Sequence, residues 1–153
     1  MPDMQIAIAS DHAGCQLKAL LLERLRTAGH DVDDLGGCAE RSDYPHAAEA
    51  VARAVADGRA ERGVLCCGSG IGVAIAANKV PGVRAATISE PLSARLAREH
   101  NDLNVICMGE RMIGPEMAWE CVHVFLSTNH ATDGRHAVRV AQIAELEQKG
   151  APA

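Results

Sequence analysis

The stretch VLCCGSGIGVAIAANK, residues 64–79, joins an apolar run to an alanine-rich segment through three glycines at alternate positions. The apolar run predicts a buried strand, and the segment after the glycines predicts a helix. Glycines in such a turn let the backbone approach a ligand closely. The free N–H groups at the start of the helix then form a cradle for an anion. The stretch therefore predicts an α/β protein that holds a phosphate or a developing oxyanion at this turn.

Two common phosphate-binding motifs do not match this turn. A P-loop needs Lys followed by Ser or Thr after its last glycine, and a dinucleotide fingerprint needs a third glycine where this chain has Val73. Cys67 directly precedes the glycines, and a helix N-terminus favours the thiolate form of a nearby cysteine. Such a thiolate can act as a nucleophile or as a general base. Alternatively, Cys66 and Cys67 only pack in the strand, where neighbours point to opposite faces and at most one faces the site.

Strand and helix patterns alternate along the rest of the chain. The alternation predicts a parallel sheet with helices on both faces, a Rossmann-like arrangement. No internal repeat or linker marks a second domain, so we expect one domain over residues 1–153. The strands are expected within residues 4–10, 30–36, 62–67, 83–89 and 103–109, and the helices within 14–30, 38–58, 71–79, 90–101, 114–127 and 131–150.

Composition excludes several classes of protein. A net charge of −5 and an aromatic content of 2% argue against binding nucleic acid, which needs basic surfaces or stacking platforms. No apolar run is long enough to span a membrane, and residues 1–10 lack the basic start of a signal peptide. The six cysteines form no C-x-x-C pair, so we expect neither a zinc site nor a thioredoxin-like redox motif. We expect a cytoplasmic protein with reduced thiols.

Polar residues follow each predicted strand. Ligands of parallel α/β sheets bind beyond the carboxyl ends of the strands, and charged groups beside a hydrophobic sheet are costly unless used. These residues are Asp11 and His12 after the first strand, 40–45 after the second, 67–70 after the third, Ser89 and Glu90 after the fourth, and Glu110 and Arg111 after the fifth.

Four further candidates lie on predicted helices. Arg135 and Arg139 are four residues apart and share a helix face, and guanidinium groups bind phosphate well. A solvated helix face is the alternative interpretation of this pair. His100 and Asn101 end the helix that follows the fourth strand. Taken alone, His100 is more typical of a capping or surface histidine than of a catalyst.

Seven motifs in the same order resemble one family over about residues 4–148. The chain resembles the type B ribose-5-phosphate isomerases, which are grouped with the galactose-6-phosphate isomerase subunits. The motifs are SDHAG, ERSDYP, CGSGIGVAIAANK, GVRAATISEP, REHNDLNV, GERMIG and DGRHAVRV.

The resemblance implies a fold and a reaction. The fold is a three-layer α/β/α sandwich with a five-stranded parallel sheet, working as a homodimer or a dimer of dimers. The reaction interconverts an aldose phosphate and a ketose phosphate, ribose 5-phosphate and ribulose 5-phosphate, through an enediolate without a metal or organic cofactor. Some members use a cysteine base at the position of Cys67, and others use a glutamate further into the helix. Ala74 and Ile75 stand at that helix position, so this chain fits the cysteine subtype.

The resemblance also implies a role for each remaining site residue. His100 would open the sugar ring with help from Asp11 or Tyr44, and Asn101 would hold a hydroxyl or an enediolate oxygen. Some of the residues would come from a neighbouring subunit, and the last helix, about residues 132–149, would pack on that partner. Ser69 and the amides of Gly68, Gly70 and Gly72 would stabilise the enediolate oxygens, and His12, Arg111, Arg135 and Arg139 would bind phosphate or hydroxyls.

Three alternatives stay open at this point. The first is an isomerase for another phosphate, such as that of allose, galactose or a tetrulose, because nothing in the motifs sets chain length. The second is a non-catalytic module that binds sugar phosphates, which has no need of both Cys67 and His100. The third is a thiol redox protein using Cys66 and Cys67, although a disulfide between adjacent cysteines closes a strained ring.

Overall fold

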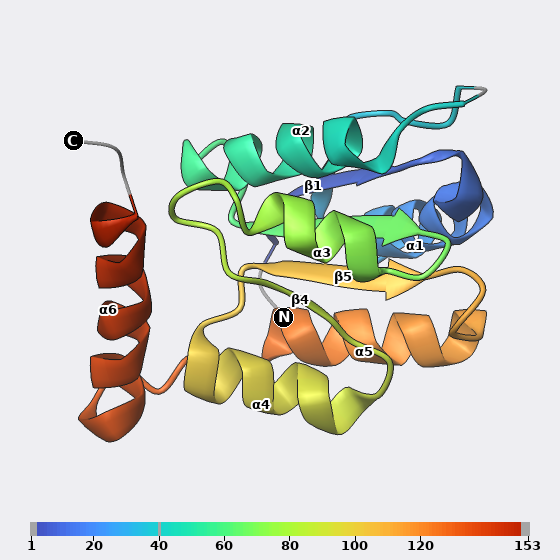
Figure 1. Cartoon of the computed structure of the whole chain (residues 1–153). Coiled ribbons are helices and arrows are strands. Elements are labelled where there is room, and N and C mark those ends of the chain that lie inside the picture. The colour runs from blue at the N-terminus through green and yellow to red at the C-terminus, as the bar shows by residue number, and fades with distance from the viewer. Residues whose placement is uncertain (1–2, 40, 151–153) are drawn as a thin grey trace.

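The computed structural model describes residues 3–39 and 41–150. Its centre is one five-stranded sheet in which every paired strand is parallel, in the order β2-β1-β3-β5-β4 (Figure 1). The predicted fold class is confirmed. The strands are β1 Gln5–Ser10, β2 Asp31–Asp34, β3 Arg62–Cys67, β4 Ala85–Thr87 and β5 Val105–Gly109.

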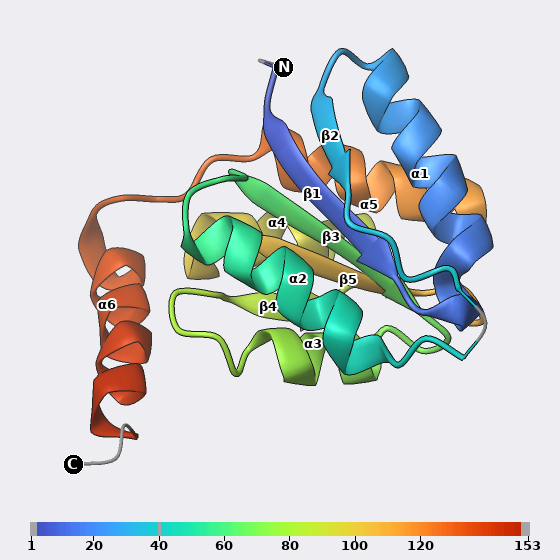
Figure 2. The same cartoon turned by 90° about the horizontal axis from the view of Figure 1, so that it is seen from above.

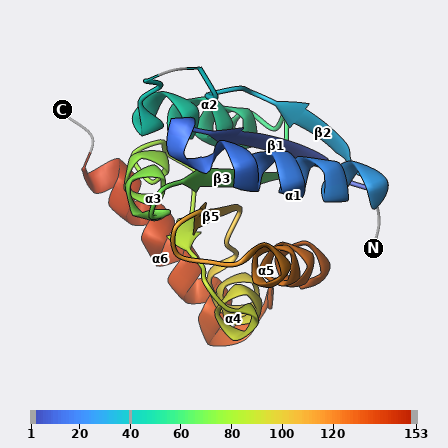
Figure 3. The same cartoon turned by 90° about the vertical axis from the view of Figure 1, so that its right-hand side faces the viewer.

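Helices cover both faces of this sheet. α1, α4 and α5 lie on one face, while α2 and α3 lie on the other, so that the sheet is the middle layer. Figure 2 shows α2 and α3 over the strands, and Figure 3, seen from the side to which the strands point, shows α2 and α5 on opposite sides of the sheet. The elements are η1 His12–Gly14, α1 Cys15–Thr27, α2 Tyr44–Ala56, α3 Ile71–Ala77, α4 Pro91–Asn101, α5 Pro115–Ser127 and α6 Gly134–Lys149.

Local signals explain where several helices begin and end. Pro lies in the first turn of α2, α4 and α5, where its missing N–H costs no helical hydrogen bond. The Glu90 carboxylate caps α4 by accepting from the N–H groups of Leu92 and Ser93. Gly29 and Gly58 follow α1 and α2 with positive φ, which ends both helices.

The alternation of side chains along the strands makes two separate apolar cores. Ile8 and Cys66 belong to the core under α1, α4 and α5, whereas Ala9 and Cys67 belong to the core under α2 and α3. The prediction that the two neighbouring cysteines face opposite sides of the sheet is confirmed. Burial raises the pKa of the Cys66 thiol, as it does for Cys107, so both stay protonated core residues.

β4 is shorter than the sequence predicted. Its expected range was 83–89, but only Ala85–Thr87 pairs with β5. At its start, the Arg84 N–H donates to the side-chain oxygen of Asn104 rather than to a strand. A strand at the edge of a sheet has a neighbour on one side only, and a side chain satisfies its backbone here.

Helix α6 stands apart from the sandwich. It lies beside the end of the molecule from which the strands start, in contact with α4, and Figures 1 and 2 show it there from two directions. No residue of α6 is buried. Among the described residues, no helix is both long and apolar enough to cross a membrane.

The expectation of six reduced cysteines is wrong for one pair. Cys15, the first residue of α1, and Cys38, in the loop after β2, form a disulfide with their Cα atoms 5.6 Å apart. The two residues are distant in sequence, and the parallel pairing of β1 with β2 brings their following segments together. Glu40 of the same loop lies outside the described residues.

Candidate active site

The carboxyl ends of β1, β3 and β5 bring nine of the predicted site residues together. Four segments contribute: the turn after β1, the start of α2, the turn between β3 and α3, and the turn after β5. Backbone hydrogen bonds join them, because the Asp11 N–H donates to the Cys66 carbonyl and the Arg111 N–H donates to the Gly68 carbonyl. The nine are Asp11, His12, Tyr44, Cys67, Gly68, Ser69, Gly70, Gly72 and Arg111.

The Cys67 sulfur lies at the mouth of the glycine turn. It is the last residue of β3 and only 4% exposed. Its Sγ accepts a hydrogen bond from the Gly70 N–H at 3.1 Å. The Ser69 hydroxyl oxygen accepts from the Ile71 N–H at 3.2 Å. One amide of the predicted cradle therefore faces the thiol itself, where it stabilises negative charge on sulfur.

Close packing requires two of the glycines in the turn. Gly70 adopts φ 76°, and a Cβ there would lie 2.7 Å from the Met108 carbonyl carbon. A Cβ on Gly72 would lie 2.5 Å from the Tyr44 ring. Gly70 therefore lets the turn cross the end of β5, and Gly72 makes room for the tyrosine at the start of α2.

The turn after β1 buries Asp11 and brings His12 into contact with the loop that follows β2. Asp11 is 7% exposed, and its carboxylate accepts from the Ala13 N–H at 2.9 Å. His12 Nδ1 lies 3.0 Å from the Ser42 carbonyl oxygen. The disulfide between Cys15 and Cys38 links the same two segments, so this side of the site is held covalently as well as by hydrogen bonds.

Arg111 brings positive charge to the turn. A Cβ on Gly68 would lie 3.5 Å from the Arg111 guanidinium carbon, which puts the cation directly over the backbone of the glycine turn. The neighbouring Glu110 carboxylate accepts from the Leu17 N–H at 2.8 Å. The pair thus separates in function: Glu110 fixes α1 to the turn after β5, and Arg111 remains the cation at the site.

Four predicted site residues lie elsewhere, at the amino edge of the sheet. His100 and Asn101 end α4 just before β5 begins at Val105. Cys67 pairs with Gly109 at the other end of β5. Arg135 and Arg139 lie on α6, the helix that stands beside the starting ends of the strands and contacts α4 (Figure 1).

A stacked pair of histidines connects α4 with α6 at this edge. The rings of His100 and His136 lie parallel, with centroids 4.0 Å apart. Desolvation, followed by the nearby charges of His100, Arg135 and Arg139, lowers the pKa of His136. This edge is therefore a cluster of imidazole and guanidinium groups, without a carboxylate among the four predicted residues.

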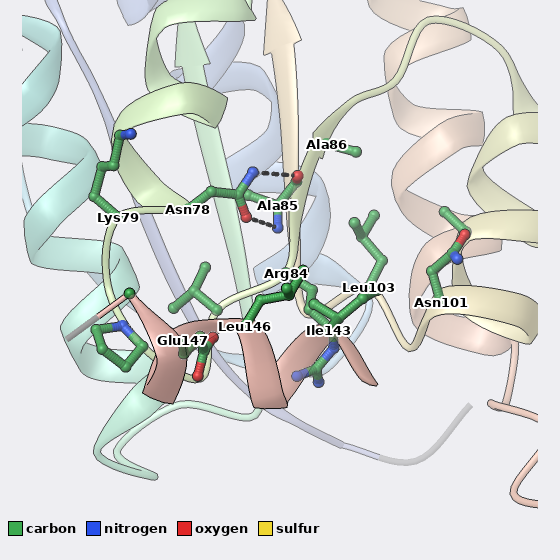
Figure 4. A pocket seen from close by; sticks show the side chains of 14 residues that line it. Asn78, Lys79, Arg84, Ala85, Ala86, Asn101, Leu103, Ile143, Leu146 and Glu147 are labelled. Atoms are coloured by element: carbon green, nitrogen blue, oxygen red, sulfur yellow. Dashed lines mark hydrogen bonds between the residues drawn. The ribbon is translucent and has the colours of Figure 1, made fainter. Parts of the chain in front are cut away.

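The amino edge also has a pocket. It has a volume of about 710 Å³ and lies between α6 and the sandwich. Figure 4 shows Asn101, Arg84, Ile143 and Glu147 around it. Cys67 does not line this pocket, so the residues predicted to act together are divided between two edges of one chain.

Two residues next to the site were missed by the sequence reasoning. His136 lies between the two arginines in the motif DGRHAVRV, so its position in that motif was the available signal. Thr87 ends β4 and donates from Oγ1 to the Gly70 carbonyl at 2.6 Å. The available signal for Thr87 in the sequence was its position near the end of the fourth predicted strand. In residues 3–39 and 41–150, no group of His, Cys, Asp and Glu has the geometry to hold a metal ion.

Comparison with known proteins identifies the family. The family model described as Ribose/Galactose Isomerase matches residues 6–143, which is nearly the whole chain. The chain belongs to the ribose/galactose isomerase family. Family membership makes it a sugar phosphate isomerase and confirms the resemblance found in its motifs.

Individual relatives of this isomerase are similar over almost their full length. It is 45% identical over 146 residues to ribose-5-phosphate isomerase B of Escherichia coli strain K12, covering 95% of this chain and 97% of that protein. It is 38% identical over 148 residues to the D-erythrulose-4-phosphate isomerase of Pectobacterium atrosepticum, covering 95% and 97%. The solved structure of ribose-5-phosphate isomerase B of Clostridium thermocellum matches with a TM-score of 0.93 and 44% identity, covering 97% of this chain and all of that one.

Proposed function

We propose that this isomerase interconverts ribose 5-phosphate and ribulose 5-phosphate, a reaction of the pentose phosphate pathway, without a metal or organic cofactor. The observation that most supports the proposal is the Cys67 thiol, which accepts from the Gly70 N–H beside Ser69 and Arg111. The relatives from Escherichia coli and Clostridium thermocellum are named for this substrate. The erythrulose-4-phosphate isomerase among the relatives makes a four-carbon phosphate the second candidate.

In the proposed reaction, Cys67 moves a proton between two carbons of the open-chain sugar. The thiolate takes the proton from C2, and the electron pair of that bond becomes the C1–C2 double bond while negative charge develops on O1. The thiol then returns the proton to C1, and the hydroxyl proton of O2 passes to O1 as O2 becomes the ketone. The Gly70 N–H holds the sulfur in place at the turn, since it donates to Sγ. Ser69 and the amides of Gly68 and Gly72 stabilise the oxyanion.

Ring opening precedes this step in the proposal. The closed sugar must gain a proton on its ring oxygen and lose one from its C1 hydroxyl. His100 donates the proton to the ring oxygen, because an imidazole both gives and takes protons near neutral pH. Asp11 or Tyr44 assists at the hydroxyl, and Asn101 holds a neighbouring oxygen of the sugar.

The proposed site is shared between two copies of the chain. Within one chain, His100 and Asn101 are at the opposite edge of the sheet from Cys67, so they can meet only if a second copy supplies one set. His12 and Arg111 would then bind the sugar together with Arg135 and Arg139 of the partner. Each chain is proposed to act as one domain over residues 1–153.

Exposed apolar side chains support this association. Ile71 and Ile75 on α3 are 54% and 59% exposed, and Val138 and Leu146 on α6 are 56% and 65% exposed. Apolar patches of this kind mark surfaces that another protein covers. We propose a homodimer, or a dimer of dimers, in which α6 of one copy packs on the other. Light scattering of the purified protein measures this state, and a monomer that retains full activity would refute the shared site.

Mixed dimers test the shared site directly. Cys67→Ala and Arg139→Ala subunits, each inactive or impaired alone, are mixed and allowed to exchange. In a shared arrangement, a mixed dimer has one site with both lesions and one site with neither, so the activity measured at a substrate concentration near the wild-type KM, where Arg139→Ala alone is slow, recovers toward half of the wild-type value. If each chain holds a complete site, every site keeps one lesion and no recovery follows.

A substrate panel tests the reaction itself. Purified protein is assayed with ribose 5-phosphate, allose 6-phosphate, galactose 6-phosphate and erythrulose 4-phosphate, with and without EDTA. The proposal expects the highest kcat/KM for ribose 5-phosphate and no effect of the chelator. A higher kcat/KM for another sugar phosphate would make that phosphate the substrate instead of ribose 5-phosphate. Activity that EDTA removes and one divalent ion restores would refute the cofactor-free mechanism. The cytoplasmic location stays a prediction of the sequence.

A further inference from the structure

The peptide group between Gly70 and Ile71 is held at both of its ends. Its carbonyl oxygen accepts from Thr87 Oγ1 at 2.6 Å. Its N–H, on Ile71, donates to Ser69 Oγ at 3.2 Å. Thr87 ends β4, at the edge of the sheet, so an edge strand reaches across to the turn that contains the proposed base.

This arrangement determines what the Ser69 hydroxyl can do. A serine hydroxyl has one proton to donate and two lone pairs to accept with. Because its oxygen accepts from the Ile71 N–H, one lone pair is occupied and the direction of the hydroxyl is restricted. Within residues 3–39 and 41–150, its proton is donated to no other group of the chain. The proton is therefore available to a ligand in the turn.

Thr87 strengthens and orients the hydrogen bond to Ser69. Donation to the carbonyl of a peptide polarises the group and makes its N–H a better donor. Rotation of the same peptide would break both contacts at once. On the other side, Gly70 lies against the end of β5, since a Cβ there would be 2.8 Å from the Gly109 nitrogen. The turn is thus fixed between β5 and the Thr87 hydroxyl.

We propose that Thr87 is a positioning residue of the isomerase: through the Gly70–Ile71 peptide, it holds the Ser69 hydroxyl in the direction in which it donates to the enediolate oxygen. The proposal rests on the proposed function, which assigns Ser69 to that oxygen. Thr87 does not itself touch the substrate. Its effect belongs to the charged intermediate, because a neutral sugar hydroxyl gains less from a well-aimed donor than an oxyanion does.

A matched control exists on the same pair of elements. The Asn78 side chain ties the other end of α3 to β4 through two hydrogen bonds with the Ala85 backbone, both 2.8 Å (Figure 4). Asn78 contacts neither Ser69 nor the Gly70 peptide through these bonds. A purely structural role of the link between α3 and β4 would make Asn78→Ala behave like Thr87→Val.

The experiment compares the wild type, Thr87→Val, Thr87→Ser and Asn78→Ala in the assembled enzyme. The measurements are kcat and KM for ribose 5-phosphate and the inhibition constants of two probes. One probe is the four-carbon aldonohydroxamate phosphate, whose planar anionic head mimics the enediolate. The other is ribitol 5-phosphate, which has the phosphate and hydroxyls but no oxyanion. Thermal melting reports on stability.

Thr87→Val is expected to lower kcat about five-fold and to weaken the hydroxamate about five-fold, the ratio that one hydrogen bond of ordinary net strength represents. KM and the ribitol 5-phosphate constant change less than about two-fold on this basis. Thr87→Ser, which keeps the donor, restores both values. Asn78→Ala melts at a lower temperature but has the wild-type kcat and the wild-type ratio of the two inhibition constants.

Other results overturn the proposal. Wild-type kcat and hydroxamate binding in Thr87→Val, an equal weakening of both probes, or the same pattern in Asn78→Ala would each exclude a positioning role. If the wild-type enzyme turns over ribose 5-phosphate in the same experiment, such results refute only the role of Thr87 and leave the proposed function intact. If the wild type neither turns over the sugar nor binds the hydroxamate, the substrate assignment fails and the proposal for Thr87 fails with it.

Discussion

The two edges of the sheet are built in different ways. At the carboxyl edge, Asp11 and Cys67 are almost completely buried, and backbone hydrogen bonds join the turns around them. At the amino edge, Arg135 and Arg139 lie on α6, a helix with no buried residue. The predicted residues at the carboxyl edge are largely buried among hydrogen-bonded turns, whereas those on α6 belong to a helix in which no residue is buried. The predicted site residues of one chain therefore lie in two groups at opposite edges of the sheet, and the following experiments test whether these groups are the two halves of a shared site.

The largest effect is expected at the carboxyl edge. Cys67→Ala should lower kcat about a thousand-fold, because the base is lost while little volume is removed. The matched control is Cys66→Ala, which changes a residue of the opposite core. It should keep kcat within about two-fold of the wild type but lower the melting temperature, since it leaves a cavity. Equal losses of kcat in the two variants would refute the assignment of the base.

The disulfide at the carboxyl edge should contribute to the stability of the folded chain. Cys38→Ser opens a loop closed over a sequence separation of 23 residues. Loop-closure entropy predicts a loss of about 3 kcal/mol in the free energy of unfolding, measured by urea denaturation. Oxidised wild type treated with a dithiol should reach the value of the variant. Identical unfolding curves for the oxidised and the reduced protein would show that the link does not stabilise this edge.

A substitution on α6 at the amino edge should affect substrate binding rather than folding. Arg139→Ala should raise KM for the phosphorylated sugar about ten- to a hundred-fold, the loss expected for a charge-assisted contact. The melting temperature should change little, because no residue of α6 is buried. Arg53→Ala is the control, since Arg53 forms an exposed pair with Glu49 on α2. A KM unchanged in Arg139→Ala would remove this arginine from the phosphate site.

The smallest effect concerns pH and a buried histidine at the amino edge. Desolvation lowers the pKa of His30 from its ordinary value of 6.5, and its Nδ1 accepts from the Met4 N–H, which protonation would prevent. The folded state therefore binds this proton less readily than the unfolded state does. The free energy of unfolding should fall as the pH drops through about 6.5 toward the folded-state pKa.

Two variants measure this contribution. His30→Asn should reduce the loss of stability between about pH 7 and pH 5, where an unfolded histidine takes up its proton. His123→Asn, at an exposed position of α5, should leave the loss unchanged. The same pH dependence in His30→Asn as in the wild type would mean that His30 does not contribute to it.

Much of the carboxyl edge could be predicted from the sequence. The period of the apolar residues predicts strands and helices locally, and parallel strands put all their following turns at one edge. The turns after β1, β3 and β5 therefore had to lie together, as Asp11, Cys67 and Arg111 do. The opposite orientations of Cys66 and Cys67 also follow from the strand period alone.

Only the tertiary structure decided the order of the strands and what followed from it. The order β2-β1-β3-β5-β4 depends on contacts between residues far apart in sequence, which local periodicity does not describe. The same contacts pair Cys15 with Cys38 and join Thr87 to the Gly70 carbonyl. The position of His100 at the opposite edge from Cys67 does not depend on this order and follows from the parallel sheet that the sequence predicts, because a helix that crosses back along such a sheet must end where the next strand begins.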